Sequence, residues 1–192
     1  MKSRLNTGDI LLFSGKGIGS TIIKIATTSK YSHIGMVLNI EDVPYCYHST
    51  TIMKPKGTKI QRLDDVIQKY NGKIYTRALR PPLTDPEKLE KLFRHCTQQE
   101  GVGYESSLWE LALSALGRKF NINLIEESKD QYCSELVRNA FNEIGILKTK
   151  KMLTPADFSP DGDWYLGQCY KIFGSLKQII SLENSSPVFC YK

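Results

Sequence analysis

Two short strands early in the chain constrain the fold most, because they hold two of its three histidines. Residues 32–38 and 45–50 both read as strands, and the acidic pair at 41–42 suits the turn between them. Side chains along a strand alternate between the two faces of a sheet. If the two strands pair across this turn, His33 and His48 become neighbours on one face.

The rest of the chain mixes short strands and helices without a regular strand–helix alternation. This pattern predicts an α+β fold, and 192 residues favour a single domain. Further strands are predicted at 9–13, 73–79 and 178–182. Helices are predicted at 20–28, at 62–70, from 86 to a break at 101–103, at 106–116 and at 133–144.

The helix that follows Asp85 has the clearest sequence signals. Asp85 suits the N-cap and Pro86 the first helical position. The apolar residues that follow at helical spacing form one stripe, so we expect Cys96 to lie in the core. His95 lies off this stripe, and we expect it to face solvent. The stripe consists of Leu89, Leu92, Phe93 and Cys96.

Cys133 is a candidate nucleophile because it stands at the start of the predicted helix 133–144. The dipole and the unpaired N–H groups at a helix N-terminus favour a thiolate, and they can also hold an oxyanion. An irregular segment precedes the helix, so we expect the sulfur to be accessible. Position alone leaves a second interpretation open, in which Cys133 is a buried cysteine that begins a core helix.

A thiol nucleophile needs a base, and the base needs a group that orients it. His33 is the candidate base, and Gly35, two residues along the same face, leaves open space beside the imidazole. His48 on the neighbouring strand can accept a hydrogen bond and orient His33. A histidine buried in the core is the alternative interpretation of His33.

A zinc site and a phosphate-binding loop are the two other kinds of site that the sequence suggests. Two cysteines and two histidines can bind zinc, but their spacing here matches no standard zinc signature. The glycine-rich segment 15–20 fits neither the P-loop nor the dinucleotide-binding pattern. We therefore expect no metal and no cofactor. The zinc alternative would use Cys46, His48, His33 and Cys133.

Composition limits the partners. The net charge of +6 indicates a solvated basic surface or an attraction to an anionic membrane, and no nucleic-acid motif is present. We expect at most a peripheral membrane contact, since no apolar run is long enough to span a bilayer and no amphipathic basic helix stands out. The five cysteines form no CxxC pair, and the N-terminus lacks a secretory signal, so we expect a cytoplasmic protein.

Five segments, taken in their order along the chain, resemble a known family. They are Gly8–Phe13, Ser32–Val37, Tyr45–Ser49, Tyr132–Val137 and Leu153–Phe158. This order resembles the permuted branch of the NlpC-type papain-like superfamily, in which the histidine strand precedes the cysteine helix. That branch includes YiiX-like bacterial proteins, their poxvirus relatives and, more distantly, lecithin:retinol acyltransferase-like enzymes.

The resemblance covers about residues 7–160 of a single domain spanning 1–192, and leaves about 165–192 as a C-terminal extension. It implies a circularly permuted papain-like fold, an antiparallel sheet with packed helices. Carried over by position, it makes Cys133 the nucleophile, His33 the base and His48 the third polar residue. It also places Tyr104, Tyr132 and Ser32 in the substrate cleft.

The implied activity is that of a thiol hydrolase or acyltransferase. Such an enzyme cleaves an amide or ester acyl bond through a thioester acyl-enzyme, and its substrate is a small molecule, a peptide or a lipid acyl compound. A non-catalytic binding protein that retains the fold is the alternative. The sequence makes no prediction of oligomeric state.

Overall fold

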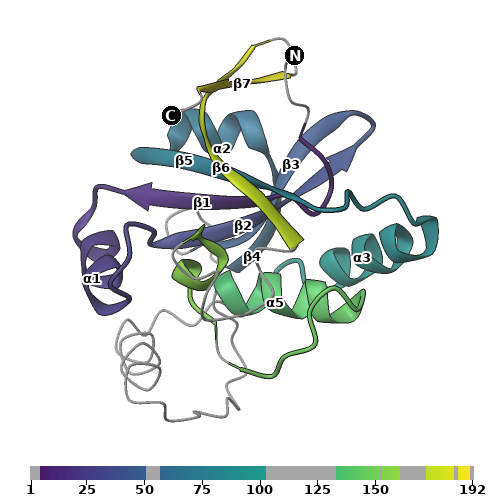
Figure 1. Ribbon diagram of the computed structural model, residues 1–192. Helices are drawn as coiled ribbons and strands as arrows, with labels where there is room; N and C mark the ends of the chain where they lie inside the picture. Colours follow the sequence, from purple (N-terminus) through teal and green to yellow (C-terminus); the bar gives the residue numbers. More distant parts are fainter. Residues whose placement is uncertain are drawn as a thin grey trace.

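The computed structural model of the chain contains an antiparallel sheet with helices on both of its faces (Figure 1). The strands follow the order β4-β3-β2-β1-β5-β6-β7, and every neighbouring pair is antiparallel. The structure describes residues 5–50, 57–102, 133–151, 153–160, 172–183 and 186–190.

The strands have between 5 and 11 residues. Their bounds are β1 Ile10–Gly15, β2 His33–Ile40, β3 Val43–Thr50, β4 Gly57–Arg62, β5 Gly72–Leu79, β6 Phe173–Glu183 and β7 Ser186–Cys190. The helices are α1 Ile18–Ala26, α2 Leu63–Lys69, α3 Pro86–Gln98, α5 Cys133–Glu143 and the 3-10 helix η1 Pro155–Phe158.

The two faces of the sheet are covered by different helices. In Figure 1, α3 and α5 lie on one side of the strands and α2 lies on the other. Alternate residues of each strand feed the two cores. The α5 face carries the larger core, in which Leu12, Ile34 and Met36 pack with helix residues such as Phe141. The α2 face carries the smaller core: Leu5, Leu11, Phe13, Val37, Cys46, Leu63, Val66, Ile74 and Ile179.

The predicted hairpin forms two neighbouring strands of this sheet, beside its middle strand β1. β2 and β3 pair antiparallel from Ile40–Val43 to Met36–Tyr47. Both turn residues, 41 and 42, have positive φ angles of 49° and 66°, as a tight two-residue hairpin turn requires. Beyond Met36 the pairing ends: β2 continues beside β1 and β3 continues beside β4. The two strands therefore separate at the end of β2 that holds His33.

The other predicted elements compare well with the structure, with two additions. The predicted strands and the helices near 20–28, 62–70, 86–98 and 133–144 all have counterparts. Strand β4 was not predicted, and β7 adds to the strand predicted at 178–182. Through β6, the C-terminal extension pairs with β5 and joins the central sheet. The helix predicted at 106–116 lies outside the described residues.

Helix α3 begins as its sequence predicts, because the Asp85 carboxylate accepts hydrogen bonds from the backbone N–H groups of residues 87 and 88. Cys96 is fully buried in the larger core, which confirms that prediction. The prediction for His95 was wrong: its side chain is partly buried, and burial lowers its pKa. His95 lies outside the apolar stripe but is still partly covered, because α5 packs alongside α3 and covers the edge of α3 as well as its apolar centre.

Candidate functional site

Three neighbouring strands align three polar side chains on the α2 face. His33 Nε2 lies 3.1 Å from His48 Nδ1, and His48 Nε2 lies 2.9 Å from Gln61 Oε1. The register explains this alignment, because Cys46 pairs with both Val37 and Gln61 and His48 follows two residues later on the same face. Diagonal neighbours across a sheet are within reach of long side chains. The alternation of side chains along the two predicted strands thus placed the two histidines correctly, but Gln61 was not predicted.

Gly35 makes the contact between the two histidines possible. A Cβ atom on Gly35 would lie 2.8 Å from Cys46 Sγ and 3.2 Å from His48 Cβ. The expected open space beside the imidazole is therefore absent, because the side chains of β3 fill it. The sequence shows that position 35 has no side chain, but only the pairing of β2 with β3 decides which neighbour fills the space.

The hydrogen bonds fix the tautomers of both rings. An amide oxygen only accepts a hydrogen bond, so Nε2 of His48 carries a proton and donates it to Gln61. Nδ1 of His48 is then free to accept from Nε2–H of His33. This leaves Nδ1 of His33 without a proton and with an available lone pair, as a general base requires.

Both imidazoles are neutral near pH 7. Burial and, after it, the neighbouring charge of His48 hold the pKa of His33 well below its usual value. Burial also lowers the pKa of His48; the hydrogen bond to Gln61 acts in the opposite direction, and the charge of Lys59 adds to the lowering. Neither ring therefore carries a second proton at rest, and Nδ1 of His33 is the nitrogen that can accept one.

Cys133 reaches this region from the opposite side of the sheet. It is the first residue of α5, and its side chain is only 4% exposed. The backbone N–H of Ile34, the residue that follows His33, lies near enough to the sulfur to lower the pKa of the thiol. The N–H of Val37 bonds toward the β1 side, so by strand alternation the N–H of Ile34 points toward β3. The thiol therefore occupies the place where β2 and β3 separate.

The thiol environment corrects two expectations. The sulfur is buried, where the sequence predicted an accessible one. Burial raises the pKa of Cys133 to about 11, although the N–H groups of Ile34, Ser134 and Cys133 itself act to lower it. The helix N-terminus thus favours the thiolate as predicted, but desolvation has the larger effect. A neutral thiol beside neutral histidines is the resting state.

Two aromatic side chains enclose the histidines. The ring of Phe13 lies 5.0 Å from that of His33 and 6.3 Å from that of His48, centroid to centroid. Tyr70, directly after α2, packs edge-on against Phe13 at 5.0 Å. Burial raises the pKa of Tyr70 to about 12; the side chain of Ser32 acts to lower it, and the charge of Cys133 adds to the rise. Tyr70 therefore belongs to the site, and no sequence motif indicated it.

Ser32 lies beside this group but is turned inward. It is buried, and its hydroxyl is 3.4 Å from both the carbonyl of Phe13 and the N–H of Gly15. It supports the end of β1, and its place in a substrate cleft stays a prediction. Tyr104 and Tyr132, the other two predicted cleft residues, lie outside the described residues.

The zinc alternative finds no support in the part of the chain that the structure describes. No group of three or more His, Cys, Asp or Glu side chains there is arranged to hold a metal ion. Cys46 packs in the core of the α2 face, and burial raises the pKa of its thiol. The cysteine that lies two residues before His48 is thus a packing residue.

Comparison with known proteins agrees with this geometry. Residues 4–187 match a family described as permuted papain-like amidase enzymes, YaeF/YiiX, C92 family. The chain belongs to this family. It is therefore a cysteine hydrolase of the papain-like class with a circularly permuted fold. No curated protein matches the chain.

One solved structure shows the same fold. It is the crystal structure of the metalloprotein yiiX from Escherichia coli O157:H7, which is 20% identical to this chain. The match has a TM-score of 0.57 and covers 93% of this chain and 98% of the other. The resemblance inferred from five short segments therefore extends over nearly the whole chain, including the C-terminal extension.

Proposed function

We propose that this protein hydrolyses an amide bond through a thioester on Cys133, with His33 as the general base. The observation that carries the proposal is the bond between His33 Nε2 and His48 Nδ1, which leaves the other nitrogen of His33 free to accept a proton. The sulfur of Cys133 lies near the backbone N–H of Ile34, the residue that follows His33, since that N–H lowers the pKa of the thiol. A base and a nucleophile are thus held on adjacent, fixed elements.

The reaction follows from the resting protonation states. As the sulfur attacks the substrate carbonyl, Nδ1 of His33 takes the thiol proton and the C–S bond forms. The backbone N–H groups at the start of α5 stabilise the oxyanion. The C–N bond then breaks, and His33 gives its proton to the leaving amine. Water, deprotonated by His33, attacks the thioester and releases the acid with the free thiol.

His48 and Gln61 act through His33 as positioning residues. When His33 becomes cationic, its Nε2–H bond to His48 strengthens, because hydrogen bonds from a charged donor are stronger. Gln61 keeps the His48 lone pair directed at His33. The same chemistry serves an ester of a lipid acyl group, or transfer of the acyl group to another nucleophile, so the bond type is decided by the substrate.

Acyl-enzyme trapping tests the proposal. The purified protein is incubated with N-acyl p-nitroanilides and with p-nitrophenyl esters of increasing acyl length, then quenched in acid for intact mass and peptide mapping. We expect chromophore release and an acyl adduct on Cys133. In His33→Ala both should slow by about 10²- to 10⁴-fold, the usual contribution of a general base. Release of nitroaniline shows amide cleavage.

A different result would favour the non-catalytic alternative. If no acyl adduct forms on Cys133 with any member of the panel, or if Cys133→Ala releases chromophore at the wild-type rate, the protein retains the fold as a binding module. Equal acylation of the wild type and His33→Ala would show that His33 is not the base.

A further inference from the structure

Helix α1 presents an apolar stripe to solvent. Ile18, Ile22 and Ile25 are 84%, 43% and 74% exposed, and their spacing of i, i+4 and i+7 places them on one side of the helix. Among the residues whose exposure is described, only one other large apolar side chain, Ile40, is classed as exposed, at 36%. Single exposed apolar residues are ordinary, but an aligned set marks an interaction surface.

The surroundings of this stripe are basic. The chain has no Asp or Glu between Asp9 and Glu41, whereas Lys16, Lys24 and Lys30 fall in that interval. Lys24 is turned back to donate a hydrogen bond to the carbonyl of Gly15, which leaves the front of the helix to the isoleucines.

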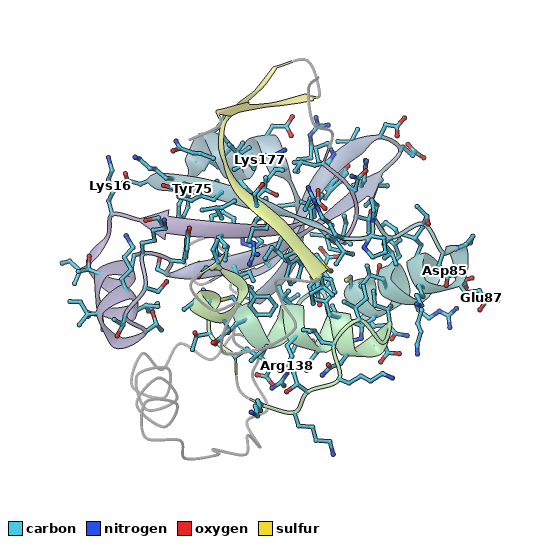
Figure 2. The ribbon with its side chains drawn as sticks, in the orientation of Figure 1. Lys16, Tyr75, Asp85, Glu87, Arg138 and Lys177 are labelled. Carbon is cyan, nitrogen blue, oxygen red and sulfur yellow. The ribbon has the colours of Figure 1, made fainter. Side chains whose placement is uncertain are left out.

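The charge distribution has a direction. Figure 2 shows Lys16 projecting from the α1 end of the sheet, and Asp85 and Glu87 at the start of α3 near the opposite end. An exposed apolar stripe with Lys16 at the N-terminal end of its helix, in a stretch without acidic residues, is an arrangement that suits the interface of an anionic membrane. The sequence predicted this helix at 20–28, which excludes Ile18, and no amphipathic basic helix was expected.

The stripe also lies at the same end of the sheet as the histidines. Helix α1 joins the end of β1 to the start of β2, where Phe13 pairs with His33. A surface that binds α1 would therefore face the end of the molecule that holds the candidate site. At this end of the sheet the hydroxyl of Ser32, just before β2, also bonds to the carbonyl of Phe13 on β1.

We propose that α1 docks the protein on the surface of an anionic phospholipid bilayer, with its three isoleucines in the headgroup–acyl boundary and Lys16 among the headgroups. Among the described residues no helix is long and apolar enough to cross a membrane, so the contact is interfacial. Docking depends on α1 alone and does not rest on the proposed catalysis.

Vesicle flotation tests the docking. The full chain is mixed with phosphatidylcholine vesicles or with phosphatidylcholine–phosphatidylserine vesicles, at low and at high salt. We expect binding to the anionic vesicles that weakens with salt, because the lysine contribution is screened. Ile18→Asp/Ile25→Asp should reduce the partition coefficient by about tenfold or more per isoleucine, since each loses the free energy of burying its side chain. Lys16→Glu should weaken binding to the anionic vesicles only.

Two controls make the test decisive. Ile40→Asp places the same charge on an exposed isoleucine away from α1 and should bind like the wild type. Cys133→Ala should also bind normally, so that a failure of catalysis and a failure of docking can be told apart. The proposal is overturned if the wild type does not float with anionic vesicles, or if the double variant floats equally well. It is also overturned if the wild type is a dimer and the double variant is a monomer that does not float, because the stripe would then bind a second copy of the chain.

Discussion

The two faces of the central sheet are made by the same strands but have different chemistry. On the α5 face, Leu12, Ile34 and Met36 pack against helices in a nearly continuous apolar core. On the α2 face, the neighbouring positions of the same strands carry Phe13, His33 and Gly35. The apolar packing fixes the strand positions, and the polar line on the other face depends on that precision. The line of histidines thus lies on the α2 face, whereas the candidate nucleophile Cys133 comes from the core of the α5 face.

Cys133 and Cys96 sharpen this comparison, because both thiols belong to the core of the α5 face. Burial raises the pKa of Cys133 to about 11 and that of Cys96 to about 12. Only Cys133 has its sulfur beside the N–H of Ile34, at the point where the sheet opens toward the histidines. Position, and not thiol acidity at rest, therefore distinguishes the nucleophile.

The largest expected effect separates the two cysteines by function. Cys133→Ala should reduce turnover by about 10⁴-fold or more, as loss of a catalytic nucleophile does, and should also lower the melting temperature, because it removes a buried sulfur. Cys96→Ala should leave turnover per folded molecule unchanged and lower the melting temperature, because it leaves a cavity in the core. Activity and thermal unfolding are measured on both variants. Comparable losses of turnover in the two variants would show that Cys133 is not distinguished from Cys96 as the nucleophile.

The next effect concerns the resting thiol. With its pKa raised to about 11, Cys133 should react with iodoacetamide slowly at pH 6 and about tenfold faster for each pH unit up to pH 10. The sign follows from burial, which favours the neutral thiol below the raised pKa. Peptide mapping after timed alkylation gives the rate. A fast, pH-independent rate between pH 5 and 7 would instead indicate a thiolate–imidazolium ion pair.

A smaller effect tests how tightly the α2 face is packed. Gly35→Ala places a Cβ against Cys46 Sγ and His48 Cβ, and it should cost about 1–3 kcal/mol in the free energy of unfolding, as overpacking does. It should also slow turnover by displacing His48. Gly17→Ala is the matched control, because its added Cβ meets nothing within 4 Å. Denaturant unfolding and turnover are measured together; a neutral Gly35→Ala would show that the histidine pair tolerates displacement.

The smallest effect is on Gln61, the outermost member of the line. Gln61→Leu removes the acceptor of the His48 Nε2–H bond and should slow turnover several-fold, about 1 kcal/mol of hydrogen-bond free energy. Gln61→Glu keeps an acceptor and adds a negative charge, which raises the pKa of His48 and moves the acid limb of the pH–rate profile to higher pH. A merely structural role would alter stability in both variants without moving that profile.

Much of the fold followed from local signals in the sequence. The hairpin around residues 41–42 and the helix after Asp85 were predictable because turn residues, caps and apolar spacing act over a few positions. Strand β4 was missed because Gly57–Arg62 contains one apolar residue among polar ones, which is a weak strand signal. Since Gln61 lies on β4, the missed strand also hid a member of the site.

By itself, the sequence determined the order of the parts: a histidine strand, a second histidine strand and a late cysteine helix, with His33 and His48 able to share a face. Periodicity and order along the chain carry this information. Only the tertiary structure decided that Gln61 and Tyr70 join the site, that the thiol is neutral at rest and that α1 exposes its isoleucines. Those outcomes depend on burial and on pairings between distant segments, which are summed over the whole fold and leave no local pattern to read.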